Sequence, residues 1–142
     1  MFISRLFAYL FPRQASITHR ERLLSALGAG LAILVMAVLS RHFIGAENLP
    51  FLAASMGASV VLLLAVPHSP FSQPWALLGG HAVAALIGIS CGKFIPDPLL
   101  AGALAVSLAV LAMFYLRCLH PPGGGTALLS VFGGAKIQAL GY

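Results

Sequence analysis

One stretch in the second half of the sequence places a cation, an imidazole, two prolines and three glycines within ten residues. It reads RCLHPPGGGT, runs from Arg117 to Thr126, and separates two apolar segments. Proline has no amide hydrogen and consecutive glycines disfavour a helix, so backbone polar groups are left free here. In hydrocarbon such groups are costly, and irregular backbone persists only where protein or water covers it. The stretch is therefore the first place to expect a binding site.

Anion binding is the chemistry that this stretch suits best. A helix that begins after the prolines points its first amide groups and the positive end of its dipole at a ligand, and glycine permits close approach. The predicted anion-binding residues are Arg117, His120, Pro121, Pro122, Gly123, Gly124, Gly125 and Thr126. In the alternative interpretation Arg117 is only a cytoplasmic anchor and the glycines serve close packing, and both remain open.

Four further polar residues are predicted to line the same path: His68, Ser69, Ser59 and His81. An ionisable side chain within an apolar segment is a functional hypothesis by default, although His81 near an interface is also consistent with simple packing. We expect Ser55 to bond a carbonyl of its own helix, and Ser59 either to do the same or to line the path. His68 and His120 are candidates for proton coupling because an imidazole changes charge near neutral pH.

Neither a metal site nor a catalytic centre is expected. The histidines and cysteines lack the His-x3-His and Cys-x2-Cys spacings of metal sites, so no metal or other cofactor is predicted. Cys91 and Cys118 are predicted to be small buried hydrophobic residues. The three acids, Glu21, Glu47 and Asp97, all fall in connections, so no carboxylate is available to orient a histidine for catalysis. The chain is therefore not expected to be an enzyme.

The composition defines the elements that must position these residues. The chain has 142 residues, 60% hydrophobic and 8% charged, which excludes a soluble domain and indicates a multi-pass membrane protein. Apolar runs long enough for helices of about 27 Å are predicted to span the membrane. They cover residues 23–40, 49–66, 75–92 and 99–116. The predicted fold is an all-α, polytopic transmembrane helical bundle over residues 23–142, with four full spans and a last segment, 127–142, that re-enters or ends the domain.

Residues 1–22 form a separate amphipathic and basic segment. Residues 1–12 have the pattern of an interfacial helix, and Thr18 with Glu21 has the spacing of a capping box. Four of the eight Lys and Arg residues precede the first span, namely Arg5, Arg13, Arg20 and Arg22. This bias predicts a cytoplasmic N-terminus in the cell inner membrane and no nucleic-acid partner. It also places residues 67–74 and 117–126 on the same cytoplasmic side, facing each other.

Several separated motifs occur together in a fixed order. They are Gly57-Ala58-Ser59, Pro67-His68-Ser69-Pro70 followed by Gln73-Pro74, Gly80-His81, and Leu119-His120-Pro121-Pro122-Gly123-Gly124 with Thr126-Ala127-Leu128. With these motifs, residues 50–142 resemble the HPP family of integral membrane proteins. The chain departs from the family pattern at Trp75, where members often have Arg, and at Gly125, where they often have Ala.

The resemblance implies four membrane spans and a transport role. Plant and cyanobacterial members of the family have been linked to nitrite transport, so an anion permeation role is implied by analogy. Trp75 removes a cation that would have served an anion path. The resemblance also implies a further apolar span after Tyr142.

The preferred hypothesis is a multi-pass transporter or channel for a small inorganic anion such as nitrite, embedded in the lipid bilayer as a homo-oligomer. An oligomer is expected because about five short helices enclose too little space for a pathway within one chain. Ala84, Gly88 and Gly92 recur at the four-residue spacing of close helix packing. The main alternative is a non-transporting sensor or scaffold that acts through its cytoplasmic loops. An intramembrane enzyme that uses only Ser and His ranks last.

Overall fold

A computed structural model describes residues 17–43, 49–139 and 141–142 of the chain. The described part is helical, with no strand. Its elements in order are α2 (His19–Phe43), α3 (Leu49–Ala65), the 3-10 turn η2 (Pro70–Ser72), α4 (Pro74–Phe94), α5 (Pro98–Tyr115), α6 (Gly123–Phe132) and α7 (Gly134–Ala139). The interfacial helix predicted for residues 1–12 lies outside the described residues.

The first span begins at the predicted capping box. The backbone amide of Thr18 donates to Glu21 Oε2 at 2.8 Å, and the amide of Glu21 donates back to Thr18 Oγ1 at 3.3 Å. These two bonds satisfy amides that the first helical turn leaves without partners, so the prediction is confirmed. Arg41 and His42 lie in the last turn of α2, where positive charge complements the helix dipole.

The predicted helical membrane bundle is confirmed. Three helices in the described part of the chain are long and apolar enough to cross a membrane: His19–His42 within α2, and all of α4 and α5. Prolines in the first turn begin both α4 and α5, where a missing amide hydrogen costs nothing. The remaining predicted span, α3, is a shorter apolar helix of 17 residues, about 25 Å long.

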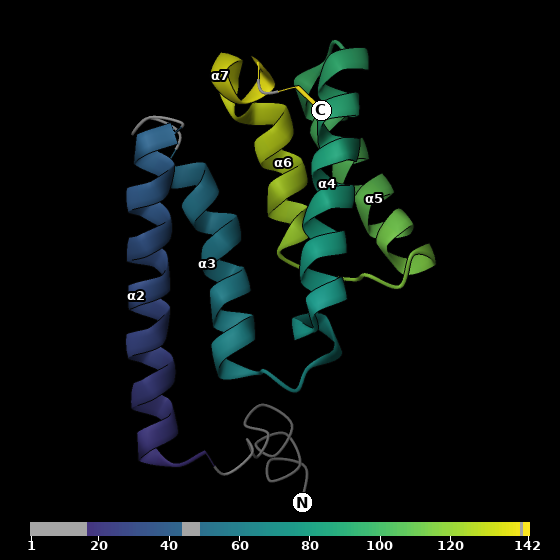
Figure 1. Ribbon diagram of the computed structural model, residues 1–142. Helices are drawn as coiled ribbons and strands as arrows, with labels where there is room; N and C mark the ends of the chain where they lie inside the picture. The colour runs from purple at the N-terminus through teal and green to yellow at the C-terminus, as the bar shows by residue number, and fades with distance from the viewer. Residues whose placement is uncertain (1–16, 44–48, 140) are drawn as a thin grey trace, which may run out of the picture.

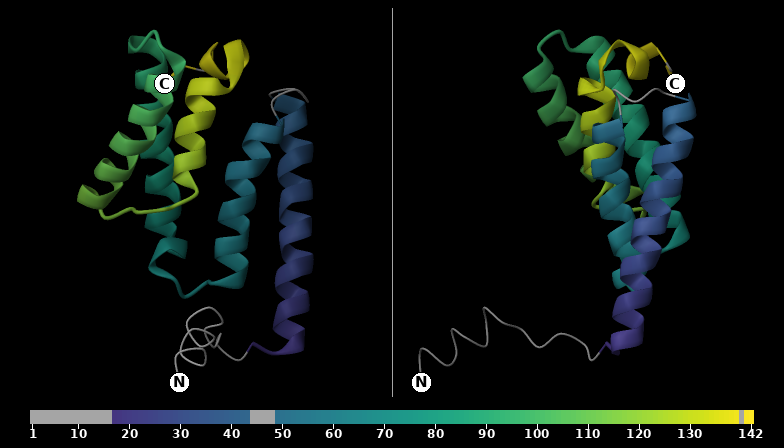
Figure 2. Two further views of the ribbon diagram at one scale, coloured as in Figure 1. Left: turned by 180° about the vertical axis from the view of Figure 1, so that it is seen from behind. Right: turned by 90° about the vertical axis from the view of Figure 1, so that its left-hand side faces the viewer.

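The helices form two groups that meet at α6. Helices α2 and α3 pack as an antiparallel pair, while α4, α5 and α6 pack on one another, and α6 also touches α3 (Figure 1, Figure 2). The core between α4, α5 and α6 consists mainly of alanines, and small side chains let the helix backbones approach closely. A Cβ atom at Gly88 of α4 would lie 2.6 Å from the carbonyl oxygen of Ala127 in α6. Glycine is therefore needed at this crossing.

The last segment does not form a full-length span. Helix α6 has 10 residues, about 15 Å, and ends at Phe132, with Gly133 as its C-cap. Gly134, the first residue of the short helix α7, has a φ of +77°. Figure 1 shows that α6 begins part-way along α4 and not level with its end. His120 and Pro122, which are both buried, thereby lie inside the bundle, beside Ser55 of α3 and Gly80 of α4.

Candidate functional site

Five side chains with exchangeable protons meet where α3, α4 and α6 adjoin. They are Ser55 and Ser59 of α3, His81 of α4, His120 of the α5–α6 connection and Thr126 of α6, and we call them the hydroxyl–imidazole cluster. His120 is fully buried, and Ser55 and Ser59 are each 3% exposed. His81 and Thr126 are half-buried, so the cluster is accessible from their side. A polar group of this size inside an apolar bundle is the strongest candidate site in the described chain.

Local sequence explains why these side chains meet. Ser55 and Ser59 are one helical turn apart, so they lie on the same face of α3. A Cβ atom at Gly80 would lie only 2.5 Å from the Cβ atom of His120, so the imidazole reaches this depth because α4 has no side chain there. Glycine at position 80 therefore sets the position of His120.

His120 connects the two proline-rich stretches. Its Nδ1 donates to the carbonyl oxygen of Phe71 at 2.8 Å, which confirms the prediction that residues 67–74 and 117–126 face each other. Ser69 and Ser72 hold the turn that carries this carbonyl. The amide of Phe71 donates to Ser69 Oγ at 3.3 Å, and the Ser72 hydroxyl donates to the carbonyl of Val66 at 2.9 Å.

The Phe71 carbonyl fixes the direction of the bonds that follow it. Because Nδ1 of neutral His120 carries the proton, its Nε2 must accept, and Ser59 donates to it at 2.9 Å. The Ser59 oxygen then accepts from Nε2 of His81 at 2.9 Å, and Nδ1 of His81 accepts from the Thr126 hydroxyl at 2.7 Å. The two neutral imidazoles therefore have opposite tautomers, with their ring centroids 4.9 Å apart.

Ser55 continues the cluster toward the start of α6. Its hydroxyl donates to the carbonyl of Pro122 at 2.9 Å and lies 2.8 Å from Thr126 Oγ1. The expectation that Ser55 bonds a carbonyl of its own helix is therefore wrong, because the close approach of α6 offers it a partner 67 residues away in sequence. Ser59 does contact its own helix, at 3.2 Å from the Ser55 carbonyl oxygen, in addition to both histidines.

The amides at the start of α6 are already occupied. Those of Gly123, Gly124 and Gly125 donate to the carbonyls of His120, Pro121 and Pro122 at 2.8, 3.1 and 3.0 Å, and Thr126 donates to Pro122 at 3.4 Å. The expectation of free amide donors is therefore wrong. Pro122 has φ −61° and ψ −19°, so the two prolines initiate the helical turn whose carbonyls accept these bonds. An anion here would have to use side-chain donors.

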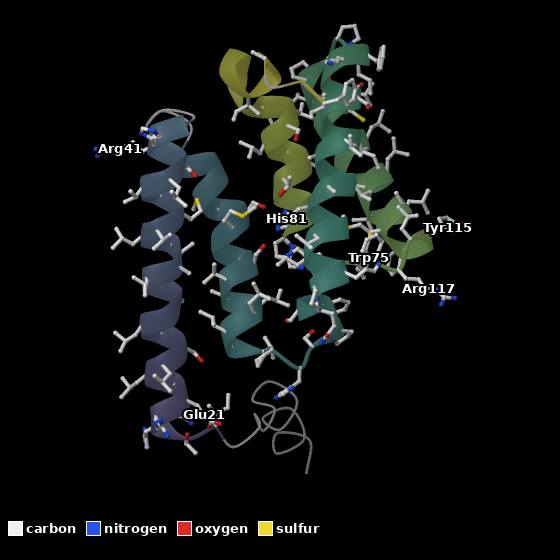
Figure 3. All side chains as sticks on the ribbon, viewed as in Figure 1. Glu21, Arg41, Trp75, His81, Tyr115 and Arg117 are labelled. Carbon is white, nitrogen blue, oxygen red and sulfur yellow. The ribbon has the colours of Figure 1, made fainter. Side chains whose placement is uncertain are left out.

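Two predicted site residues lie away from the cluster. Arg117 is exposed, and Figure 3 shows its side chain pointing outward, well away from His81. Its φ of 55° places it in the left-handed region just after α5 ends. His68 is exposed on the connection between α3 and η2. Both remain predictions as binding residues, and neither forms part of the cluster.

The cysteines behave as their sequence context suggests. Cys91 and Cys118 are both buried and unpaired, as predicted. Across the described residues, no group of three His, Cys, Asp or Glu side chains is arranged to hold a metal ion.

An apolar groove lies beside the cluster, between α3 and α6. Its volume is about 600 Å³, and it reaches the cluster at Ser55. The other lining residues are Ala54, Ala58, Pro121, Pro122, Gly125, Leu128, Leu129 and Phe132. A small ligand in this groove would meet a hydroxyl and helix backbone along mainly apolar walls.

The fold and the buried polar cluster define an all-helical, multi-pass membrane protein. The chain belongs to the HPP family, because the family model described as HPP, transmembrane region, matches residues 14–142. Two transmembrane proteins of Dictyostelium discoideum are similar to it, one 39% identical over 111 residues and the other 37% identical over 105 residues. The aligned parts cover 75% and 71% of this chain but only 36% and 37% of the relatives. No solved structure matches the chain.

Proposed function

We propose that this chain is the membrane part of a transporter for a small inorganic anion, with nitrite as the first candidate. The observation that carries the proposal is the hydroxyl–imidazole cluster, which is enclosed by helices that are otherwise almost entirely apolar. Polar and ionisable groups are costly within a membrane, and they are typical of substrate and proton pathways. Nitrite is chosen as the candidate because of the family resemblance, and not because of the geometry of the cluster.

The chemistry of the cluster favours an anion over a cation. Hydroxyl and imidazole groups supply N–H and O–H donors, and a protonated imidazole supplies positive charge. In the described residues no carboxylate hydrogen-bonds to the cluster: Glu21 bonds Thr18 and Asp97 caps α5. The adjoining groove of about 600 Å³ is large enough for a small ion with some of its water.

The proposed setting is the cell inner membrane, with the N-terminus in the cytoplasm and several copies of the chain together. Orientation is supported by the four arginines before the first span. A homo-oligomer is supported by α2, whose apolar span has none of its residues buried against the rest of the described chain. Bilayer lipid or neighbouring subunits would cover this helix.

The test is anion flux into liposomes that contain the purified protein. Nitrite, nitrate, formate and chloride are compared at two pH values, and the passive leak of nitrous acid is measured in empty liposomes. We expect saturable nitrite uptake above this leak. Absence of protein-dependent flux for all four anions would contradict the proposal.

The alternative is a non-transporting sensor or scaffold, and one observation favours it. Among the described residues, every buried side-chain nitrogen or oxygen has a hydrogen-bond partner, as expected for a cluster that only locks helices together. This alternative predicts that cluster variants lose stability while no variant, and no wild-type protein, carries any of the four anions.

A further inference from the structure

The short hydrogen bonds of the hydroxyl–imidazole cluster require more protons than a neutral cluster contains. Six contacts of 2.9 Å or less link its five side chains to one another and to the carbonyls of Phe71 and Pro122. Each contact needs a proton of its own. The three hydroxyls and two neutral imidazoles supply only five.

The missing proton is that of the contact between Ser55 and Thr126. In the neutral cluster the proton of Ser55 goes to the carbonyl of Pro122, and that of Thr126 goes to Nδ1 of His81. The Ser55 and Thr126 oxygens nevertheless lie 2.8 Å apart, which leaves two acceptors facing each other. One additional proton on Nδ1 of His81 removes the conflict, because His81 then donates to Thr126 and Thr126 turns to donate to Ser55.

We infer that the cluster is a binding site for one proton, which His81 and His120 share through Ser59. The inference rests on the proposed function in one respect: the bound proton is the positive charge that accompanies the transported anion. Loading takes place at His81, which is half-buried, while His120 is fully enclosed.

The proton passes between the histidines by two coupled transfers. The Nε2–H bond of His81 breaks and its proton forms a bond to Ser59 Oγ, while the original hydroxyl proton of Ser59 moves to Nε2 of His120. Before the transfer His81 is the imidazolium, and afterwards His120 is. All six short contacts keep one proton each in both states, so neither position is disfavoured by a lost hydrogen bond.

Among the described residues, the elements around the cluster supply no negative charge for this proton. The titratable or charged residues described on the neighbouring elements are His68, Cys91, Lys93, Asp97, Tyr115, Arg117 and Cys118. Cys91 is buried in the core between α4, α5 and α6. His68, Tyr115 and Arg117 are exposed, Lys93 lies over the ring of Tyr142, and Asp97 caps α5. Cys118 is buried against Gly79 and does not bond the cluster.

A buried cation without a counter-ion is costly, so an anion in the adjoining groove stabilises the bound proton. By linkage the bound proton stabilises the anion to the same extent. Anion and proton are therefore expected to move together, one for one, with no net charge.

The transport test uses liposomes whose membrane potential is clamped with potassium and valinomycin and which contain a pH-sensitive dye. Nitrite and nitrate are the probes, and nitrate is included because its acid does not leak. We expect one proton to enter with each anion and a rate that does not depend on the potential. Flux that rises with a positive interior and carries no protons would overturn the inference but leave the proposed transport function standing.

A second measurement does not depend on transport. In the purified wild-type protein with ¹⁵N-labelled histidine, NMR should show opposite tautomers for neutral His81 and His120, and the uptake of one shared proton. Thr126→Ser should preserve this behaviour, while Ser59→Ala should uncouple the two titrations. Independent titration of the two histidines in the wild type would overturn the inference, even if no anion were transported.

Discussion

The first and third spans are both long apolar helices, but Gly30 in the first and Gly80 in the third have opposite surroundings. A Cβ atom at Gly30 of α2 would meet nothing within 4 Å, whereas one at Gly80 of α4 would lie 2.5 Å from the Cβ atom of His120. In the most apolar segment of α2 no residue is buried against the rest of the described chain, whereas in that of α4 33% of the residues are buried. Apolar composition thus places both helices in the membrane, while absent side chains determine which of them can hold a functional site.

The largest expected effect comes from Gly80→Ala. The added methyl group would displace His120, and overpacking of this kind typically costs about 1–3 kcal/mol. We expect a lower thermal unfolding temperature in detergent and loss of anion flux. The matched control is Gly30→Ala, which should stabilise α2 by up to ~1 kcal/mol because alanine favours the helix. If Gly80→Ala and Gly30→Ala changed the unfolding temperature and the anion flux equally, the proposed difference between α2 and α4 would be wrong.

A loss of stability similar to that of Gly80→Ala, but without displacement of His120, is expected for Ser55→Ala. The substitution leaves the Pro122 carbonyl without its buried donor, at a cost of about 1–3 kcal/mol in the free energy of unfolding. Ser107→Ala is the control, since Ser107 is exposed and its hydroxyl bonds only the Ala103 carbonyl of its own helix. Thermal unfolding of both variants, measured side by side, checks the prediction. It fails if Ser107→Ala is the more damaging change.

Cys118 provides a probe of the face of α4 that carries Gly79. Burial raises the pKa of the Cys118 thiol, so the reactive thiolate is scarce at neutral pH. We expect no maleimide labelling of the folded protein at pH 7, and full labelling after unfolding. Mass spectrometry of digested protein identifies the modified residue. Rapid labelling of the native protein would mean that the α5–α6 connection is not packed on α4 as described.

The smallest effect is expected for Arg117→Ala. Its side chain is exposed and points away from the cluster, so we expect nitrite uptake to change less than about twofold, as for most surface charges. His120→Gln, measured in the same liposomes, should abolish uptake. Equal losses in the two variants would restore Arg117 as a binding residue and weaken the role assigned to the cluster.

The sequence predicts the spans much better than it predicts the site. Apolar runs locate α4 and α5 to within about two residues, which is the usual uncertainty of helix ends. The pairing of Ser55 with Pro122 has no such signal, because it depends on how closely two helices distant in sequence approach. Gly88 and Gly80 permit that approach, but a small residue alone does not reveal its partner.

The start of α6 differs from the sequence-based prediction for a related reason. Two prolines followed by three glycines predict an open backbone, since each residue alone disfavours a helix. In the structure the fixed φ of Pro122 suits a first helical turn, and the carbonyls of residues 120–122 accept all four amides that follow. The polar contacts of this stretch with α3 and α4 are therefore made by the side chains of His120 and Thr126 and by the Pro122 carbonyl, and not by the amides.

The most direct test of the role assigned to the hydroxyl–imidazole cluster is the initial rate of nitrite uptake by Ser59→Ala, compared with wild type and Ser107→Ala in liposomes of equal protein content. Ser59 joins both histidines, so its hydroxyl is needed for any proton transfer between them. We expect a loss of at least about a hundredfold, the low end of what proton-transfer groups contribute, with Ser107→Ala unchanged. Uptake by a correctly folded Ser59→Ala protein at the wild-type rate would contradict this role.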